Sequence, residues 1–177
     1  MKRIIAFVSL ALFVLPLSAK GTPFAAGFGL SDSAGNFGLN LELSSPTFAR
    51  DFLIVRAESQ LDFLSLPGVS SDAAWSKFSS HRLGLAGNGG WNSETIRLYG
   101  EFGGLMVLPD SSFSEKTAQW GIYGLFGFEF FVIDDKNPVA YYLEAGSTGL
   151  FGGADKLPDD PSYYSGFCTK TGLRFYF

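Results

Sequence analysis

The chain has 177 residues, a length that suits one domain. Its 13 Lys and Arg against 17 Asp and Glu give a formal net charge of -4, which argues against nucleic-acid binding because that function needs a basic patch. The single cysteine, Cys168, excludes an internal disulfide. No apolar run after the first residues is long enough to cross a bilayer as a helix, which excludes a helical membrane protein.

The first segment, residues 1–19, has the three parts of a secretory signal peptide. It begins with a Lys-Arg pair, continues as an apolar run over residues 4–17 and ends on small residues up to Ala19. This run is shorter than the roughly 20 residues of a transmembrane helix. We expect cleavage after Ala19, with Gly21 as the alternative, and a mature domain of residues 20–177. Loss of the Lys-Arg pair would leave 11 Lys and Arg against 17 Asp and Glu, a net charge of -6.

The rest of the chain alternates apolar and polar residues, which predicts strands with one apolar and one polar side. In residues 37–44, for example, Phe37, Leu39, Leu41 and Leu43 share one side. Most of the alternating segments have about 9 to 11 residues, the length of a tilted strand that crosses a bilayer. In chain order the predicted strands are residues 24–30, 37–44, 53–63, 81–91, 96–108, 120–130, 139–149 and 163–177.

The connections between these strands alternate in length. Long connections rich in Pro, Gly, Ser and Asp are expected at residues 64–80, 109–118 and 150–162. Shorter ones are expected at residues 45–52, 92–95 and 133–138, and the first connection, residues 31–36, departs from the alternation because it is short too. Short turns on one rim and long loops on the other are typical of bacterial outer-membrane barrels.

A soluble eight-stranded barrel also alternates, so the pattern alone does not separate it from a membrane barrel. Three features favour the membrane barrel. The polar sides contain little lysine, the chain ends inside its last strand at Phe177, and aromatic residues gather near strand ends, as in the girdles that anchor a barrel at the two membrane interfaces. The expected girdles are Phe24, Trp91, Phe130, Tyr141 and Phe177 on the short-turn rim and Phe37, Phe63, Trp120 and Tyr163 on the loop rim.

The last strand, with Leu173, Phe175 and Phe177 at alternate positions, resembles the C-terminal signature of bacterial outer-membrane proteins. The mature chain resembles the small eight-stranded barrels of the OmpA, OmpX and OmpW type in length, strand count and terminal strand. The resemblance implies an all-β fold, an eight-stranded antiparallel up-and-down transmembrane β-barrel. It further implies a monomer in the cell outer membrane, with both ends periplasmic, that contacts outer-membrane lipid and the barrel-assembly machinery.

The polar sides of the strands would face the barrel interior, which in an eight-stranded barrel is just wide enough for side chains to fill it. Buried charges persist only when they are paired, so the near balance of acids and bases predicts ion pairs that neighbouring strands could supply. The network would plug the barrel, with a narrow polar pore as the alternative. The charged interior residues are Glu42, Arg56, Glu58, Asp62, Arg82, Arg97, Glu101, Glu129, Glu144, Lys170 and Arg174.

One catalytic hypothesis involves the single histidine, His81. Ser79, His81 and Asp110 share the outward side near the loop rim, and a hydroxyl, an imidazole and a carboxylate in contact would form an activated nucleophile for lipid ester hydrolysis. The lipid A deacylase pattern has histidine before serine, and this sequence reverses that order. We therefore do not expect an enzyme. With one His and one Cys we expect no metal site and no cofactor.

The leading functional expectation is a plugged or narrow barrel that holds its long loops outside the cell, where they would contact a surface ligand. The alternative is a conduit for small solutes. The resemblance to OmpW-type barrels implies that such solutes could be hydrophobic and leave sideways through the wall. The lipid-modifying enzyme is the third expectation.

Overall fold

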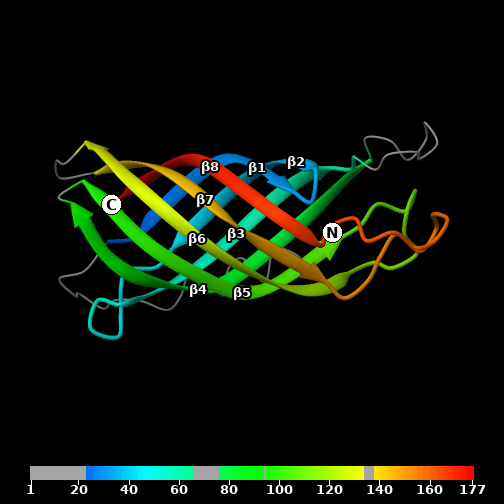
Figure 1. The fold of residues 1–177 in the computed structure, drawn as a ribbon, viewed down its shortest axis with the longest axis horizontal. Coiled ribbons are helices and arrows are strands. Elements are labelled where there is room, and N and C mark those ends of the chain that lie inside the picture. The colour runs from blue at the N-terminus through cyan, green and yellow to red at the C-terminus, as the bar shows by residue number, and fades with distance from the viewer. Residues whose placement is uncertain (1–22, 66–75, 94, 134–137) are drawn as a thin grey trace.

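The computed structural model describes residues 23–65, 76–93, 95–133 and 138–177. The predicted signal peptide, residues 1–19, and its cleavage site lie outside the described residues. Eight antiparallel strands in sequence order form one closed barrel (Figure 1). They are β1 (Ala25–Ser33), β2 (Asn36–Ser44), β3 (Leu53–Phe63), β4 (Lys77–Ser93), β5 (Ile96–Leu108), β6 (Gln119–Ile133), β7 (Val139–Leu150) and β8 (Gly166–Tyr176).

The first and last strands close the barrel. β1 pairs with β8 over its whole length, from Ala25 opposite Tyr176 to Ser33 opposite Cys168. Beyond the pair, the backbone N–H of Phe177 donates to the carbonyl of Phe24 at 2.9 Å. Closure leaves neither strand with an open edge, which is what a barrel in lipid requires.

Apolar side chains point out of the barrel and polar ones point in. On β2, Leu41 is 67% exposed and its neighbour Glu42 is 2% exposed, and on β5, Phe102 is 64% exposed whereas Glu101 is 6% exposed. A soluble barrel would have the opposite arrangement, with its apolar side chains inside. The alternation predicted from the sequence is therefore confirmed, and it has the parity of a membrane barrel.

Several predicted strand limits differ from the structure, and at two of them the strand continues with residues that face the interior. The first connection was expected at residues 31–36, but β1 continues to Ser33 because Ser31 and Ser33 face the interior. The turn itself is only Ala34 and Gly35, both with positive φ, as a tight hairpin requires. β4 begins at Lys77 and not at residue 81, because Phe78 and Ser80 also face inward.

The last predicted strand also begins too early. It was expected from Tyr163, but β8 starts at Gly166. Tyr163 and Tyr164 instead fold into the mouth of the barrel, where they are 1% and 0% exposed. Tyr163 is thus an interior residue at the loop rim and does not belong to the lipid-facing girdle predicted there.

The connections differ between the two rims. Residues 109–118 and 151–165 extend from one end of the barrel, and the C-terminus lies at the other (Figure 1). The connection between β3 and β4 reaches the same rim, and of it only Leu64, Ser65 and Ser76 are described. Within the described residues, no helix has both the length and the apolarity to cross a membrane.

Candidate functional site

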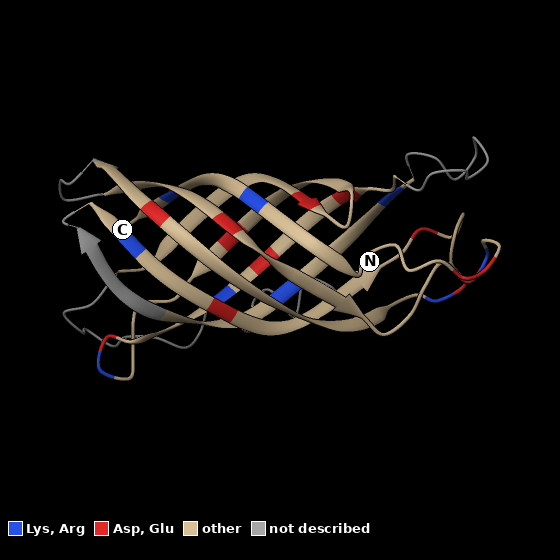
Figure 2. Cartoon of the chain, viewed as in Figure 1, with Lys and Arg blue, Asp and Glu red and all other residues tan. Residues whose placement is uncertain are grey.

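The barrel interior is the first candidate site, and Figure 2 shows charged residues along the strands of the barrel as well as in its loops. All eleven charged residues predicted for the interior are 6% exposed or less. Five acids and five bases among them form ion pairs within 4 Å. The sixth acid, Asp62, accepts hydrogen bonds from the Ser80 hydroxyl at 2.8 Å and from the Gln60 amide.

Some ion pairs join neighbouring strands, as the sequence suggested, among them Arg97 on β5 with Glu129 on β6. Others cross the lumen, which the sequence did not predict. Arg56 on β3 contacts Glu101 on β5 at 2.6 Å and Glu144 on β7, the opposite wall, at 3.1 Å. Lys170 on β8 joins Glu58 on β3 to Glu144, which lies 2.9 Å away. The spacing of residues in the sequence predicts which side of a strand a residue lies on. It does not predict which residue of the opposite wall its side chain contacts.

Nearer the C-terminal end of β8, Arg174 is the centre of a second group. It contacts Glu42 on β2, Glu129 on β6 and Glu144 at 3.3 Å. Arg97 on β5 donates to the same Glu129 at 2.6 Å. These contacts link side chains from β2, β5, β6, β7 and β8 inside the barrel.

Three buried tyrosines, Tyr99, Tyr123 and Tyr142, lie among these charges in the interior. The hydroxyl of Tyr123 donates to Glu101 at 2.6 Å, and the Tyr99 hydroxyl donates to Glu144. Arg174 lies 4.6 Å from the centre of the Tyr142 ring, a cation–π contact. Glycine makes room for these rings: a Cβ on Gly127 would lie 2.3 Å from the ring of Tyr99.

A cap of aromatic side chains lies at the loop end of the interior. It consists of Phe78, Phe113, Tyr163 and Tyr164, all 3% exposed or less. Phe113 and Tyr163 pack edge to face with ring centres 5.0 Å apart, and Phe78 lies 5.8 Å from Phe113. Sequence analysis missed this cap, because the four residues come from β4 and two loops and share no periodicity.

Polar contacts hold the cap in the mouth of the barrel. The amide of Asn36 donates to the carbonyls of Ser33 and Tyr163 and accepts from the backbone N–H of Ser65. On the other side, the Thr148 hydroxyl donates to the carbonyl of Tyr164. The cap therefore connects the β1–β2 turn, the β3–β4 connection and β7.

The two long described loops also bind each other. The backbone N–H of Glu115 donates to the Asp155 carboxylate at 2.9 Å, and the Lys156 amine donates to the carbonyl of Ser111 at 2.7 Å. The hydrogen bond from Glu115 lowers the pKa of Asp155. The backbone N–H and hydroxyl of Ser112 lower the pKa of Asp110 in the same way. We name the contacts between residues 109–118 and 151–165 the loop clamp.

The three residues of the catalytic hypothesis are not hydrogen-bonded to one another in the structure. Ser79 and His81 lie on the outward face of β4, while Asp110 follows β5 and its carboxylate accepts from Ser112 at 2.8 Å. Among the described residues, no hydrogen bond joins Ser79, His81 and Asp110. Nor does the described part of the chain contain a group of three or more His, Cys, Asp or Glu side chains placed to hold a metal ion.

Comparison with solved structures supports the fold. The chain is similar to the outer membrane protein Ail of Yersinia pestis, solved in a phospholipid bilayer nanodisc, with a TM-score of 0.50 and 15% sequence identity. The match covers 88% of this chain and 99% of that one. No protein-family model and no curated protein matches the sequence. The chain thus has the fold of a small outer-membrane barrel, as the terminal strand and the strand count predicted.

Proposed function

We propose that the protein is an integral outer-membrane barrel with a closed interior, whose clamped loops form a binding surface outside the cell. The apolar outer wall supports the membrane position, because a belt of Leu and Phe exposed to water would be unfavourable and the same belt in lipid is not. The shared fold with an outer membrane protein supports the same location.

The observation that carries the closed interior is the set of ion pairs between opposite walls. Isolated charges in a low-dielectric interior cost several kcal/mol each. Arg56, Lys170 and Arg174 each contact two or more carboxylates, so moving one of them aside to admit an ion would break several contacts at once. This arrangement favours the plug over the narrow pore and over a conduit through the lumen.

The loop rim supports the binding role. The loop clamp and the cap hold residues 109–118 and 151–165 in one arrangement, and a preordered surface loses less conformational entropy when it binds. This surface exposes charges of both signs, among them Glu115, Lys116, Asp159 and Asp160. We infer a polar or charged surface ligand for these loops.

The test starts with the protein isolated from outer membranes and reconstituted in phosphatidylcholine bilayers. We expect a band that shifts on heating, the mark of a folded barrel, and no single-channel steps above those of protein-free bilayers. Channel steps, or uptake of a hydrophobic dye by protein-containing vesicles, would favour the conduit instead. Recovery of the protein in the periplasmic fraction would contradict the membrane assignment.

The loops are tested on whole cells. Alanine at Lys116 and Lys156, the two loop lysines, should reduce adhesion of cells to a panel of anionic surfaces while the heat shift of the barrel remains. The matched control is alanine at Arg50, an exposed cation in the turn on the opposite rim. Loss of lipid deacylation in His81→Ala would instead favour the esterase.

A further inference from the structure

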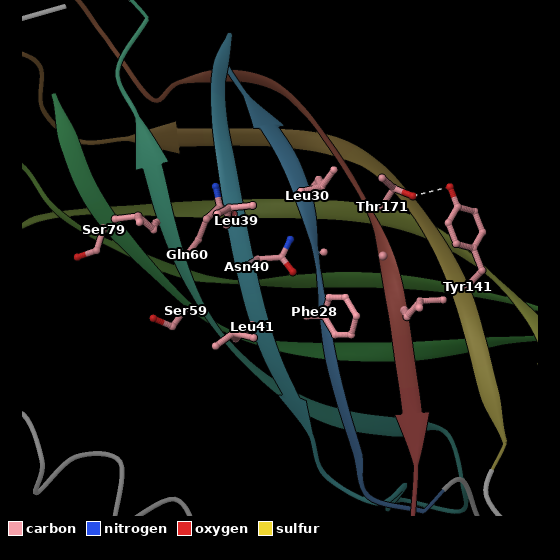
Figure 3. Close-up of a pocket in the computed structure, with 14 residues that line it drawn as sticks. Phe28, Leu30, Leu39, Asn40, Leu41, Ser59, Gln60, Ser79, Tyr141 and Thr171 are labelled. Carbon is pink, nitrogen blue, oxygen red and sulfur yellow. Dashed lines mark hydrogen bonds between the residues drawn. The ribbon is translucent and has the colours of Figure 1, made fainter. Parts of the chain in front are cut away.

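A hollow of about 1020 Å³ lies on the outer wall, over β8, β1, β2 and β3 (Figure 3). Apolar side chains on its border point outward: Phe28 is 50% exposed and Leu41 is 67% exposed. Asn40 and Gln60, which also line it, are buried and face the interior. None of the described residues that line it is charged. The apolar border of the hollow therefore faces the medium that surrounds the barrel.

Two rows of side chains, each aligned across neighbouring strands, border the hollow. One row runs from Thr171 on β8 to Ser79 on β4, with leucines on β1, β2 and β3 between them. The next row runs from Leu173 on β8 through Phe28 and Leu41 to Ser59 on β3. Four strand spacings of ~4.8 Å make the first row about 19 Å long.

Hydroxyl groups stand at both ends of the hollow. At the β8 end the Thr171 hydroxyl donates to the hydroxyl of Tyr141 at 2.6 Å, so these two bond each other (Figure 3). At the other end are Ser59 and Ser79, and among the described residues neither hydroxyl has a protein partner. A hydroxyl that faces hydrocarbon without a partner is costly, so these two call for an acceptor from outside the chain.

We propose that the hollow is a binding site for one membrane lipid, with an acyl chain in the hollow and an ester oxygen that accepts hydrogen bonds from Ser59 and Ser79. This inference rests on the membrane position proposed above. The depth agrees: Ser79 is the third residue of β4, at the loop rim, and Thr171 is the sixth residue of β8, deeper in the wall. A lipid has its esters near the interface and its chain tail further in, in the same order.

The shape argues against a second copy of this chain as the occupant. A two-fold dimer brings the same patch of both copies together, and two facing hollows would leave space between them unfilled. An acyl chain is flexible and can fill one hollow alone. The lack of charge in the lining also disfavours recognition of a phosphate or a sugar, so the site should select the chain and ester and not the headgroup.

The experiment uses the full-length gene product isolated from the outer membrane and reconstituted in vesicles of palmitoyl-oleoyl phosphatidylethanolamine and phosphatidylglycerol. Native mass spectrometry after detergent extraction counts the lipids that stay bound. We expect one retained lipid per barrel, of either headgroup. Ser59→Phe with Ser79→Phe occupies the serine end of the hollow and removes both hydroxyls, and should lower the retained fraction about tenfold.

Two further variants keep the test decisive. Ser59→Ala with Ser79→Ala removes only the hydroxyls, so it should lower retention even if the Phe variant does not fold. Gly104→Phe is the matched control, because it adds the same ring to open space on β5, across the barrel. It should leave retention unchanged.

Equal retention in wild type and both serine variants would overturn the lipid site. So would a folded wild-type barrel that retains no lipid, although that result would leave the proposed function intact. A mass of two chains, lost in the Phe variant, would overturn it in favour of a dimer. A wild-type chain that does not enter the vesicles would contradict the proposed function itself, and the lipid site with it.

Discussion

At the scale of single residues, Glu144 is where the interior contacts converge. Its carboxylate lies within 4 Å of Arg56, Lys170 and Arg174, and it accepts from the Tyr99 hydroxyl. A single acid thus compensates cations from two walls of the barrel. A neutral substitute at this position should therefore destabilise the protein far more than the same change at a glutamate on the surface.

We therefore predict that Glu144→Gln lowers the free energy of unfolding by about 3 kcal/mol, because it leaves buried cations without their partner. Urea unfolding of the barrel in lipid vesicles measures this change. Glu115→Gln, on an exposed loop residue, is the control and should stay within ~0.5 kcal/mol of wild type. A similarly small effect of Glu144→Gln would show that the interior pairs contribute little.

At the scale of strands and loops, the loop clamp depends on one carboxylate that is charged at neutral pH. Asp155 has a pKa below its ordinary value of 3.8, because the charged form accepts from Glu115. A lowered pKa means that the contribution is fully present above pH 3.8 and disappears as the pH falls through the lower, folded value. The hydrogen bond from Glu115 to Asp155 should thus weaken only in strong acid.

We predict that hydrogen-exchange protection of the Glu115 amide is constant above pH 3.8 and falls below it. Asp155→Asn should lower the protection at neutral pH and remove its pH dependence. Asp159→Asn, an exposed acid of the same loop, serves as the control. Protection that falls equally in wild type and Asp155→Asn would mean that another group opens the loops.

The strands also show which parts of the fold could be predicted from the sequence. Strict alternation located β3 and β5 to the residue, because each strand keeps one face in an apolar and one in a polar environment. The alternation did not locate the strand ends near Ser31, Phe78 and Tyr163. The interior contains small polar and aromatic residues there, which do not continue the alternation of apolar and charged residues. The aromatic cap and the hollow depend on loop packing and on strand register, which no local pattern encodes.

At the scale of the whole molecule, the barrel is complete only when β8 meets β1. The side chain of Phe177, just beyond β8, is 65% exposed, and its backbone N–H bonds Phe24. An exposed terminal ring contributes little to the packing of the finished barrel. Because this strand resembles the C-terminal signature of outer-membrane proteins, we propose that the ring acts earlier, when the free strand is recognised for assembly.

We predict that Phe177→Ala refolds in vesicles with an unchanged heat shift but reaches the outer membrane of cells several-fold less efficiently. Fractionation of cells followed by unheated gels measures the assembled share. Phe151→Ala, which removes an equally exposed ring at the loop rim, should assemble normally. Equal assembly of both variants would contradict a role of Phe177 in recognition.

The ion pairs across the lumen also bear on the order in which the chain must be put together. β8 supplies Lys170 and Arg174, two of the five interior cations. Before it arrives, six interior acids face only Arg56, Arg82 and Arg97, a local excess of three negative charges that falls to one when β8 docks. A barrel without β8 would thus contain acids that repel one another, and docking of β8 neutralises most of that excess charge. Closure and charge balance are reached in the same step.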